Sequence, residues 1–504
     1  MDRANMSPAV PPAVPPAVPP IVPPQLLQPA VRLATDGPPA TRRVGDLPAP
    51  KGAPIIGNMR QLDGAYFHRT LENWARELGP LFRFTVLGRP MVVSSDRTAL
   101  TALMRERPDL IRRGSRTSAM MEEVITPGVF SAEGDDWRQQ RKLVMRALTP
   151  EVVHNFFPTL AALTERLRVR WAKAAAEGRR IDVLRDLKAW TLDVTIGLAM
   201  GHDSDTLQQD ENPLQRDIEL VFARLASRLT TPIPYWRVFR LAVDRESDAA
   251  AQRISDAVAG FIAIARKKME ANPALRAKPS NMLEALVAAR DEPGSGFTDK
   301  AVIGNAITMV FAGEDTTSNT IGWLLDFLVR HPEQLAGVTR EADGILGTGN
   351  VVQDIRLLDD MPYLDAAIRE AMRLKPVAPF MILEPVADIV VDDTLIPAAT
   401  PIFTLLRHSF ERENTLTDPD LFQPERWLAQ GTAGADDPAR KLFPFGGGPR
   451  FCPGRYLAMA EMKMAVSMLA HGFTPLLDPV APPVEERFTF TMTPSVLPVL
   501  LRAR

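Results

Sequence analysis

Residues 445–454 read Phe-Gly-Gly-Gly-Pro-Arg-Phe-Cys-Pro-Gly, and this stretch holds the only cysteine of the chain, Cys452. A single cysteine can form no intramolecular disulfide, and it cannot build a tetracysteine zinc site or an iron–sulfur cluster. Three roles stay open for Cys452. It can be a nucleophile, a small buried hydrophobe, or one thiolate ligand of a metal whose other ligands come from a macrocycle.

The neighbours of Cys452 favour the third role. The three glycines before it carry no Cβ atoms, so the backbone can turn tightly and approach a flat ligand closely. Pro453 suits the first turn of a helix, and apolar residues recur at helical spacing from Leu457 to Leu469. A cysteine at a helix start feels the positive end of the helix dipole, which favours the thiolate. Arg450 could pair with a carboxylate of the ligand.

This segment resembles the cysteine-ligand loop of the cytochrome P-450 family, whose pattern is Phe-Gly-x-Gly-x-Arg-x-Cys-x-Gly. All fixed positions are met, by Phe445, Gly446, Gly448, Arg450, Cys452 and Gly454. The resemblance implies haem b (iron protoporphyrin IX) as the cofactor and Cys452 as the metal ligand. It also implies that Phe445, Gly446 and Arg450 bind the cofactor. The family's fold is mainly α, a triangular helical prism with a small β-rich region.

A second motif lies inside a long predicted helix, which begins after the N-cap residue Thr298 and ends before Pro332. Its centre, residues 312–317, reads Ala-Gly-Glu-Asp-Thr-Thr within an otherwise apolar helix. Glycine weakens a helix, and a threonine hydroxyl can bond back to an upstream carbonyl and bend it. Such an opening could hold a small ligand and water. A kinked structural helix with solvent-facing acids is the alternative.

The motif resembles the oxygen-activating helix of the same family. By this resemblance, Ala312 and Gly313 contact the cofactor, and Thr316 is catalytic through a hydrogen bond to dioxygen or its water. Asp315 is the second catalytic residue and helps to deliver protons, for which an acid beside a hydroxyl is suited. Glu314 occupies the variable position and receives no catalytic role.

Trp137 and Arg141 form a further pair, four residues apart on one face of a predicted helix. The resemblance implies that this pair binds the cofactor by holding a haem propionate. Many relatives also carry a propionate-binding arginine in the strand that corresponds to residues 377–384, where this chain has no basic residue. The sequence therefore leaves the partner of the second propionate open, with Arg407 among the candidates.

A structural cluster is also predicted. Glu370 and Arg373 share a helix face at i, i+3 spacing, and Arg426 follows in a Pro-Glu-Arg-Trp segment. Together they resemble the Glu–Arg–Arg cluster of the family, which stabilises the cysteine side of the core and takes no part in catalysis.

Residues 1–45 differ from the rest of the chain. From Ala9 to Pro24 the sequence repeats Ala-Val-Pro-Pro, which favours extended polyproline II over helix or sheet. We predict a proline-rich disordered N-terminal segment, with a docking segment for a partner as the alternative. No apolar run approaches the roughly 20 residues that span a bilayer, and the layout of a signal or transit peptide is missing. We therefore expect no membrane anchor and a cytoplasmic location.

The remaining sequence predicts one large domain. Hydrophobic residues make up 45% of the chain and charged residues 24%, which suits a globular core. Helical patterns continue from about residue 60 without an evident linker, so we predict a single haem domain over residues 46–504, ordered from about Leu47. Short strands are predicted at Leu81–Leu87 and Met91–Ser94, with Gly88 in the turn between them. The net charge of −2 argues against general nucleic-acid binding.

The predicted function is that of a soluble, bacterial-type haem-thiolate monooxygenase. It would insert one oxygen atom from O2 into an apolar organic substrate, with pocket walls that include residues 488–492. Two electrons would come from a separate donor, a ferredoxin with its reductase or a flavodoxin-type protein. The alternatives are a peroxide-driven peroxygenase on the same fold and a non-enzymatic haem sensor or carrier. The pair of Asp315 and Thr316 favours O2 activation over both.

Overall fold

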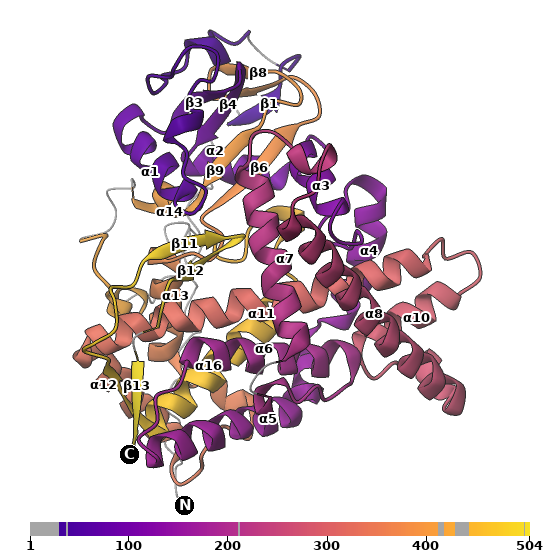
Figure 1. Cartoon of the computed structure of the whole chain (residues 1–504), viewed down its shortest axis with the longest axis vertical. Coiled ribbons are helices and arrows are strands. Elements are labelled where there is room, and N and C mark those ends of the chain that lie inside the picture. Colours follow the sequence, from indigo (N-terminus) through magenta and orange to yellow (C-terminus); the bar gives the residue numbers. More distant parts are fainter. Residues whose placement is uncertain (1–29, 37–38, 210–211, 412–417, 429–442, 498) are drawn as a thin grey trace, which may run out of the picture.

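The fold has two parts, a helical body and a smaller β-rich part at the top of Figure 1. The computed structural model describes residues 30–36, 39–209, 212–411, 418–428, 443–497 and 499–504. The described α-helices are α1 (Phe67–Leu78), α2 (Arg97–Arg105), α3 (Ser115–Glu122), α4 (Gly134–Ala147), α5 (Pro150–Ala176), α6 (Val183–Met200), α7 (Pro213–Thr230), α8 (Ala242–Ala271), α9 (Ala274–Ala277), α10 (Met282–Asp291), α11 (Asp299–Arg330), α12 (Pro332–Leu346), α13 (Pro362–Leu374), α14 (Leu406–Glu411) and α16 (Arg455–Gly472).

The central element is α11, which crosses the middle of the body in Figure 1. It begins as predicted, because the Thr298 hydroxyl caps it by accepting a hydrogen bond from the Ala301 N–H at 3.2 Å. It stays helical through residues 312–317. Most of its side chains are buried, so tertiary packing offsets the low helix propensity of its glycines and threonines.

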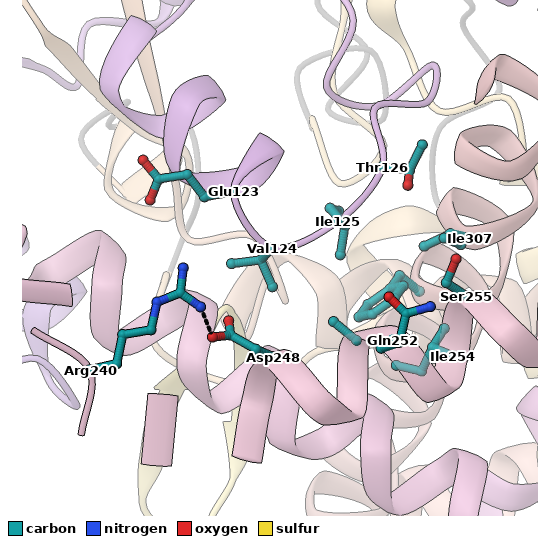
Figure 2. A pocket seen from close by; sticks show the side chains of 12 residues that line it. Glu123, Val124, Ile125, Thr126, Arg240, Asp248, Gln252, Ile254, Ser255 and Ile307 are labelled. Atoms are coloured by element: carbon teal, nitrogen blue, oxygen red, sulfur yellow. Dashed lines mark hydrogen bonds and ion pairs between the residues drawn. The ribbon is translucent and has the colours of Figure 1, made fainter. Parts of the chain in front are cut away.

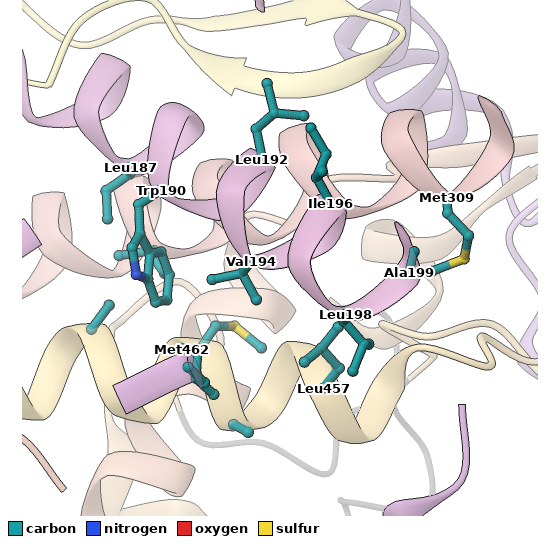
Figure 3. Packing of buried hydrophobic residues seen from close by; sticks show 14 of the residues in the cluster. Leu187, Trp190, Leu192, Val194, Ile196, Leu198, Ala199, Met309, Leu457 and Met462 are labelled. Carbon is teal, nitrogen blue, oxygen red and sulfur yellow. The ribbon is translucent and has the colours of Figure 1, made fainter. Parts of the chain in front are cut away.

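The core of the body lies where α6 crosses α16 (Figure 3). Trp190, Val194 and Leu198 recur every four residues on one face of α6 and meet Leu457 and Met462 of α16. Each of these side chains is buried, and burial of one large apolar side chain contributes about 1.5–3 kcal/mol. The helix that follows Cys452 is thereby fixed against the middle of the molecule.

Two sheets form the β-rich part. The larger has the order β3-β4-β9-β6-β5 and the smaller β1-β7-β8-β2. The predicted strands at Leu81 and Met91 are observed as an antiparallel pair joined at Leu87 and Gly88. The strands of both sheets are β1 (Val31–Leu33), β2 (Arg42–Arg43), β3 (Leu81–Val86), β4 (Arg89–Ser94), β5 (Ile111–Arg113), β6 (Phe380–Pro385), β7 (Ile389–Val391), β8 (Thr394–Ile396) and β9 (Ile402–Leu405).

Ordered structure begins earlier than the sequence predicted. β1 pairs antiparallel with β7, and β2 pairs in parallel with β8, so residues before Leu47 belong to a sheet. The sequence analysis missed these strands because they are two or three residues long and their partners lie about 350 residues away. The proline-rich repeat lies in residues 1–29, outside the described residues, and the division into a tail and a haem domain stays a prediction.

Two C-terminal hairpins complete the fold. One pairs β10 (Phe473–Leu477) with β13 (Val499–Ala503), and the other pairs β11 (Glu486–Thr489) with β12 (Thr491–Pro494). The β11–β12 hairpin lies against α11. Within the part of the chain that the structure describes, no helix combines the length and apolar character needed to cross a membrane.

Candidate active site

The loop before α16 holds Cys452 in a fixed turn. The Cys452 N–H donates to the Phe445 carbonyl at 2.8 Å. Gly446 and Gly448 adopt φ values of 70° and 63°, which favour glycine. A Cβ on Gly448 would also lie 2.2 Å from the Met104 carbonyl oxygen. The glycines of the motif are therefore required by the turn and by its contact with α2.

The Cys452 thiol experiences two opposing influences. Burial raises its pKa, whereas hydrogen bonds from the backbone N–H groups of Gly454 and Arg455 and the charge of Arg141 lower it. In the protein alone burial dominates. The two amides point at the sulfur and match a thiolate, the form that a bound metal cation would impose.

Trp137, Arg141 and Arg450 come together beside this loop. The Arg450 guanidinium lies over the Trp137 ring, 4.6 Å from its centroid, and donates to Glu133 at 2.7 Å. Arg141 donates to the Phe451 carbonyl at 2.6 Å. α4 thus brings its predicted pair to the cysteine loop.

Two further arginines, Arg107 and Arg113, join Arg450 and were not predicted. Burial lowers the pKa of Arg107 to about 9 and that of Arg450 to about 10, and the mutual repulsion of the guanidinium groups adds to the effect. The Nε atoms of all three are buried and have no hydrogen-bond partner within the described residues. Glu133 is the carboxylate that acts on this group. No sequence motif marks Arg107 and Arg113, because they come near Arg450 only when α2 packs on the cysteine loop and β5 contacts Glu133.

This excess of buried positive charge fits a ligand that carries carboxylates. The single thiol beside it fits a metal whose other ligands are not side chains. Among the described residues, no group of three or more His, Cys, Asp or Glu side chains could hold a metal ion. The residues present therefore fit haem, which combines an iron with two propionates.

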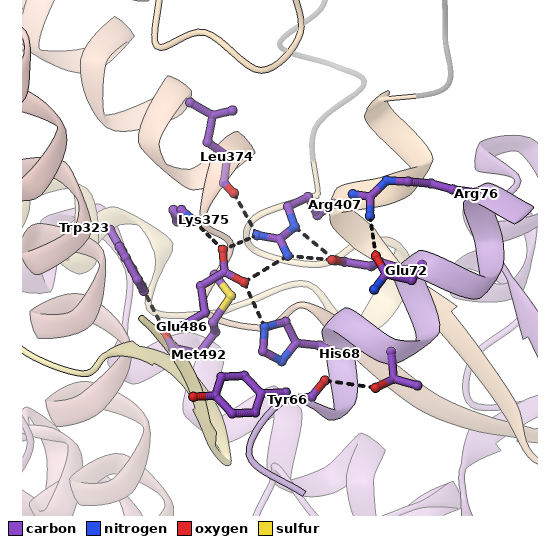
Figure 4. Close-up of polar contacts among 12 residues, drawn as sticks. Tyr66, His68, Glu72, Arg76, Trp323, Leu374, Lys375, Arg407, Glu486 and Met492 are labelled. Carbon is purple, nitrogen blue, oxygen red and sulfur yellow. Dashed lines mark hydrogen bonds and ion pairs between the residues drawn. The ribbon is translucent and has the colours of Figure 1, made fainter. Parts of the chain in front are cut away.

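Arg407, a candidate partner of the second propionate, lies elsewhere. Its guanidinium pairs with the carboxylates of Glu72 and Glu486 (Figure 4). The predicted Glu–Arg–Arg cluster is confirmed. The Glu370 carboxylate accepts from Arg373 at 2.8 Å and from Arg426 at 2.9 Å.

On α11, the motif of residues 312–317 presents a short accessible strip. Ala312 is exposed and Thr316 half-buried, although most of their neighbours are buried. The Thr316 hydroxyl donates to the Ala312 carbonyl at 2.8 Å, which is the predicted back-bond. A Cβ on Gly313 would lie 2.0 Å from Thr195 Oγ1, so this glycine is needed for the close approach of α6.

The acids of the motif are buried, so the alternative with solvent-facing acids is wrong. Asp315 Oδ1 lies 3.3 Å from Lys188 Nζ, and Asp315 Oδ2 accepts a hydrogen bond from Thr491. Glu314 has no hydrogen-bond partner for either carboxylate oxygen among the described residues, and burial raises its pKa well above the ordinary value. Lys188 and Thr491 were not predicted from the sequence, since they lie 127 and 176 residues from Asp315.

The cysteine loop and the motif are joined through α4 and α16. Asn305 of α11 donates to Gln140 of α4 at 2.9 Å, and α16 packs on α11. A pocket of about 270 Å³ opens on the same helix (Figure 2). Ile307 and Phe311 of α11 line it, and so does the ion pair of Arg240 and Asp248.

Comparison with known proteins agrees with this geometry. A family model for cytochrome P-450 matches residues 47–500, so the chain belongs to the cytochrome P-450 family. The family resemblance and the mainly α fold predicted from the sequence are confirmed, and the cofactor of the family is haem.

The relatives found are named self-sufficient or bifunctional proteins. A self-sufficient cytochrome P-450 monooxygenase of Aspergillus kawachii is 25% identical over 456 residues, which are 89% of this chain and 42% of that protein. One of Oidiodendron maius is 26% identical, over 86% of this chain and 40% of that protein. A bifunctional cytochrome P-450/NADPH–P-450 reductase of Acremonium egyptiacum is 26% identical, over 86% of this chain and 41% of that protein. The chain thus spans about two fifths of the length of these relatives.

These names correct one prediction. We expected a separate electron donor, a ferredoxin with its reductase or a flavodoxin-type protein, but the relatives are called self-sufficient or are bifunctional with a reductase. The error has a physical reason. The residues around Cys452 and on α11 determine how a haem is held and reveal nothing about the source of its electrons.

Proposed function

We propose that this chain is a haem-thiolate monooxygenase that inserts one oxygen atom of O2 into an apolar organic substrate. One observation carries the proposal. The Cys452 sulfur accepts two backbone hydrogen bonds beside three buried arginines, whose combined positive charge exceeds the negative charge of Glu133, the carboxylate that acts on them. When bound, haem supplies the redox chemistry that activates O2.

On the cysteine side, the chain's residues hold and orient the cofactor. Cys452 is the proposed metal ligand, and the backbone turn around Phe445 and Gly446 keeps it in place. Arg450, Trp137 and Arg141 are proposed to hold one carboxylate of the cofactor. Arg107 and Arg113 supply the positive charge for the other, since their Nε atoms have no partner among the described residues.

On the α11 side, the residues are proposed to bind O2 and to deliver protons to it. Ala312 is proposed to let the cofactor lie close to the helix. Gly313 is proposed to contact it through its backbone, since Thr195 of α6 fills the side where a Cβ would lie. Thr316 offers a hydroxyl on the accessible strip, and Asp315 is the proton donor beside it. Lys188 connects Asp315 with Glu219, whose carboxylate is half exposed and lies 3.5 Å from Lys188 Nζ, so protons have a route from solvent.

The substrate is proposed to enter through the pocket at Ile307 and Phe311, which has an apolar side at these two residues and a polar side that includes Arg240 and Asp248. Electrons are proposed to come from NADPH through a reductase of the kind named in the relatives. The cytoplasmic location stays a prediction of the sequence.

The experiment uses the haem-loaded chain and its Cys452→Ser variant. The wild type should show the absorption signature of thiolate-ligated haem after reduction under carbon monoxide, and the variant should bind haem without it. A variant that keeps the signature would disprove the ligand assignment. Turnover with labelled O2, NADPH and the reductase should place the label in the product. Product formed from hydrogen peroxide alone, and not from O2, would favour the peroxygenase.

A further inference from the structure

The tip of the β11–β12 hairpin carries an unusual residue. Thr489 pairs with Thr491, so Phe490 alone makes the turn. Its φ is 75°, a region that side chains other than glycine rarely adopt and that is costly for a bulky residue. Such strain persists only where surrounding contacts maintain it.

Aromatic contacts maintain it. The Phe490 ring stacks on Phe222 of α7 with centroids 5.7 Å apart, and Phe222 meets Phe311 of α11 edge to face at 4.9 Å. Phe130, from the loop after α3, approaches Phe490 at 6.4 Å. Rings from four elements therefore form a row of contacts that runs from Phe130 through Phe490 and Phe222 and ends at Phe311, the residue before Ala312. Phe130 and Phe490 are incompletely buried, so part of this aromatic group is accessible to a ligand.

The next residue along the hairpin reaches the oxygen helix. Thr491 donates its hydroxyl hydrogen to Asp315 Oδ2, and it accepts a hydrogen bond from Asn319 at 3.2 Å. With Lys188 on Oδ1, both carboxylate oxygens of Asp315 have partners. Both oxygens of Asp315 are thus held by α6 and by the hairpin, and release of Oδ2 would let the carboxyl group turn toward the Thr316 hydroxyl.

The base of the hairpin is held by contacts of its own, separate from those of the tip. Glu486, at the start of β11, binds Arg407 and His68, as Figure 4 shows. Trp323 donates to the Met492 carbonyl at 3.0 Å. A ligand that pushes Phe490 off Phe222 must therefore move the tip, and Thr491 moves with it.

We propose that the hairpin tip is a ligand-operated latch on Asp315. Thr491 is the positioning residue that holds Asp315 Oδ2, and Phe490 is the residue that a ligand displaces to release it. The inference deepens the proposed function, on which it rests. It makes proton delivery depend on an occupied pocket, so that the enzyme does not reduce O2 without substrate.

Thermodynamic linkage provides the test. If ligand binding breaks the contact between Thr491 and Asp315, the free energy of that contact opposes binding. Removing the contact must then tighten ligand binding by the factor that corresponds to this free energy. Two probes are titrated optically into the ferric, haem-loaded chain. Imidazole coordinates the iron with its nitrogen and is too small to need the tip moved, whereas 4-phenylimidazole adds a ring for the aromatic group.

Thr491→Val should raise the affinity for 4-phenylimidazole about tenfold, which is the scale of a hydrogen bond to a charged acceptor. The affinity for imidazole should stay within twofold of the wild type. Thr491→Ser keeps the hydroxyl and should behave as the wild type. Thr493→Val is the matched control, since Thr493 lies on the same strand and donates to Asn319 at 2.8 Å. It should change neither probe. In an Asp315→Ala background, Thr491→Val should have no further effect.

Three results would overturn the latch. They are an unchanged ratio of the two affinities in Thr491→Val, an equal change in Thr493→Val, or a full effect of Thr491→Val in the Asp315→Ala background. A wild-type chain that gives no spectral change with imidazole would instead overturn the proposed function, and the latch with it.

Discussion

At the scale of single residues, Thr316 illustrates how one side chain can have a structural and a chemical task. Its hydroxyl donates to the Ala312 carbonyl, and its oxygen still has acceptor capacity on the accessible strip of α11. Thr320, one turn further on, makes the same type of bond to the Thr316 carbonyl at 2.8 Å but is buried. The two threonines make the same local hydrogen bond, but only the hydroxyl of Thr316 is accessible to a ligand.

This difference gives a first prediction. Thr316→Ala should keep haem and ligand binding, but a larger share of the electrons should end in hydrogen peroxide, because the distal hydroxyl is lost. Thr320→Ala removes an equivalent back-bond without touching the strip and should keep the wild-type ratio of product to peroxide. The measurement is product and peroxide formed per NADPH consumed. Full coupling in Thr316→Ala would contradict the assignment.

Gly313 gives a second prediction. A Cβ there would lie 2.0 Å from Thr195 Oγ1 and 2.8 Å from its Cγ2. Overpacking of this kind costs about 1–3 kcal/mol, which exceeds the ~1 kcal/mol that alanine gains over glycine in a helix. Gly313→Ala should therefore lower the free energy of unfolding, and Thr195→Ala in the same chain should recover part of the loss.

The control is a helical glycine with open space around it. A Cβ on Gly344 of α12 would meet no neighbouring side chain or packed element within 4 Å, so Gly344→Ala should raise stability by about 0.5–1 kcal/mol. Chemical denaturation followed by circular dichroism measures all of these variants. If Gly313→Ala is stabilised as much as Gly344→Ala, the close approach of α6 does not constrain this position.

At the scale of elements, the sequence predicted the helix starts and turns that depend on neighbouring residues alone. The Thr298 cap and the apolar period predicted α11, and Gly88 between two apolar runs predicted the turn of β3 and β4. The turn at Cys452 followed from its glycines. Each of these features depends on residues within about ten positions of one another.

The missed features depend on contacts between distant elements. Lys188 of α6 and Thr491 of β12 both reach Asp315, and Arg107 approaches Arg450 although 343 residues separate them. No spacing rule contains this information, because it arises only when the elements pack. The aromatic group around Phe490 was predicted in part, since residues 488–492 were expected to line the pocket, but its contact with Phe222 of α7 was not predicted, for the same reason.

The contact between α16 and α11 gives a third prediction. Glu461 of α16 is buried, and burial raises the pKa of its carboxyl to about 8 in spite of a hydrogen bond from Thr317. From about pH 4.5 to 8 the unfolded chain ionises this group and the folded chain does not. Stability should therefore fall by about 1.4 kcal/mol per pH unit over that window through this residue alone.

Glu461→Gln should remove this dependence on pH. The free energy of unfolding of the variant should therefore rise relative to that of the wild type as the pH rises, and the relative gain should disappear below about pH 4.5. Unfolding measured across the window tests it. An exposed glutamate, Glu77, supplies the control, since Glu77→Gln should leave the pH dependence as it is. Parallel curves for the wild type and Glu461→Gln would mean that the carboxyl is ionised in the folded state.

At the scale of the whole molecule, a buried ion cluster ties the β-rich part to the body (Figure 4). Arg407, at the start of α14, joins Glu72 of α1 to Glu486 of β11, and Lys375 adds a second cation at the end of α13. Burial alone would raise the pKa of Glu486, but hydrogen bonds from His68 and Arg407 and the nearby positive charges outweigh it and hold the pKa far below its ordinary value. Four elements from opposite ends of the chain meet here.

The cluster gives the last prediction. Arg407→Leu would leave two buried carboxylates without their shared cation, which should lower the free energy of unfolding by about 3–5 kcal/mol at neutral pH. Arg356→Leu removes an arginine of an exposed pair with Asp354 and should leave stability unchanged. The lowered pKa of Glu486 contributes its full stability only above the pKa that this group has in the unfolded chain. The difference in free energy of unfolding between the wild type and Arg407→Leu should therefore narrow as the pH falls below about 4.5. A gap that stays constant with pH would assign the loss to packing around Arg407, and ionic pairing would then not be what joins the two parts.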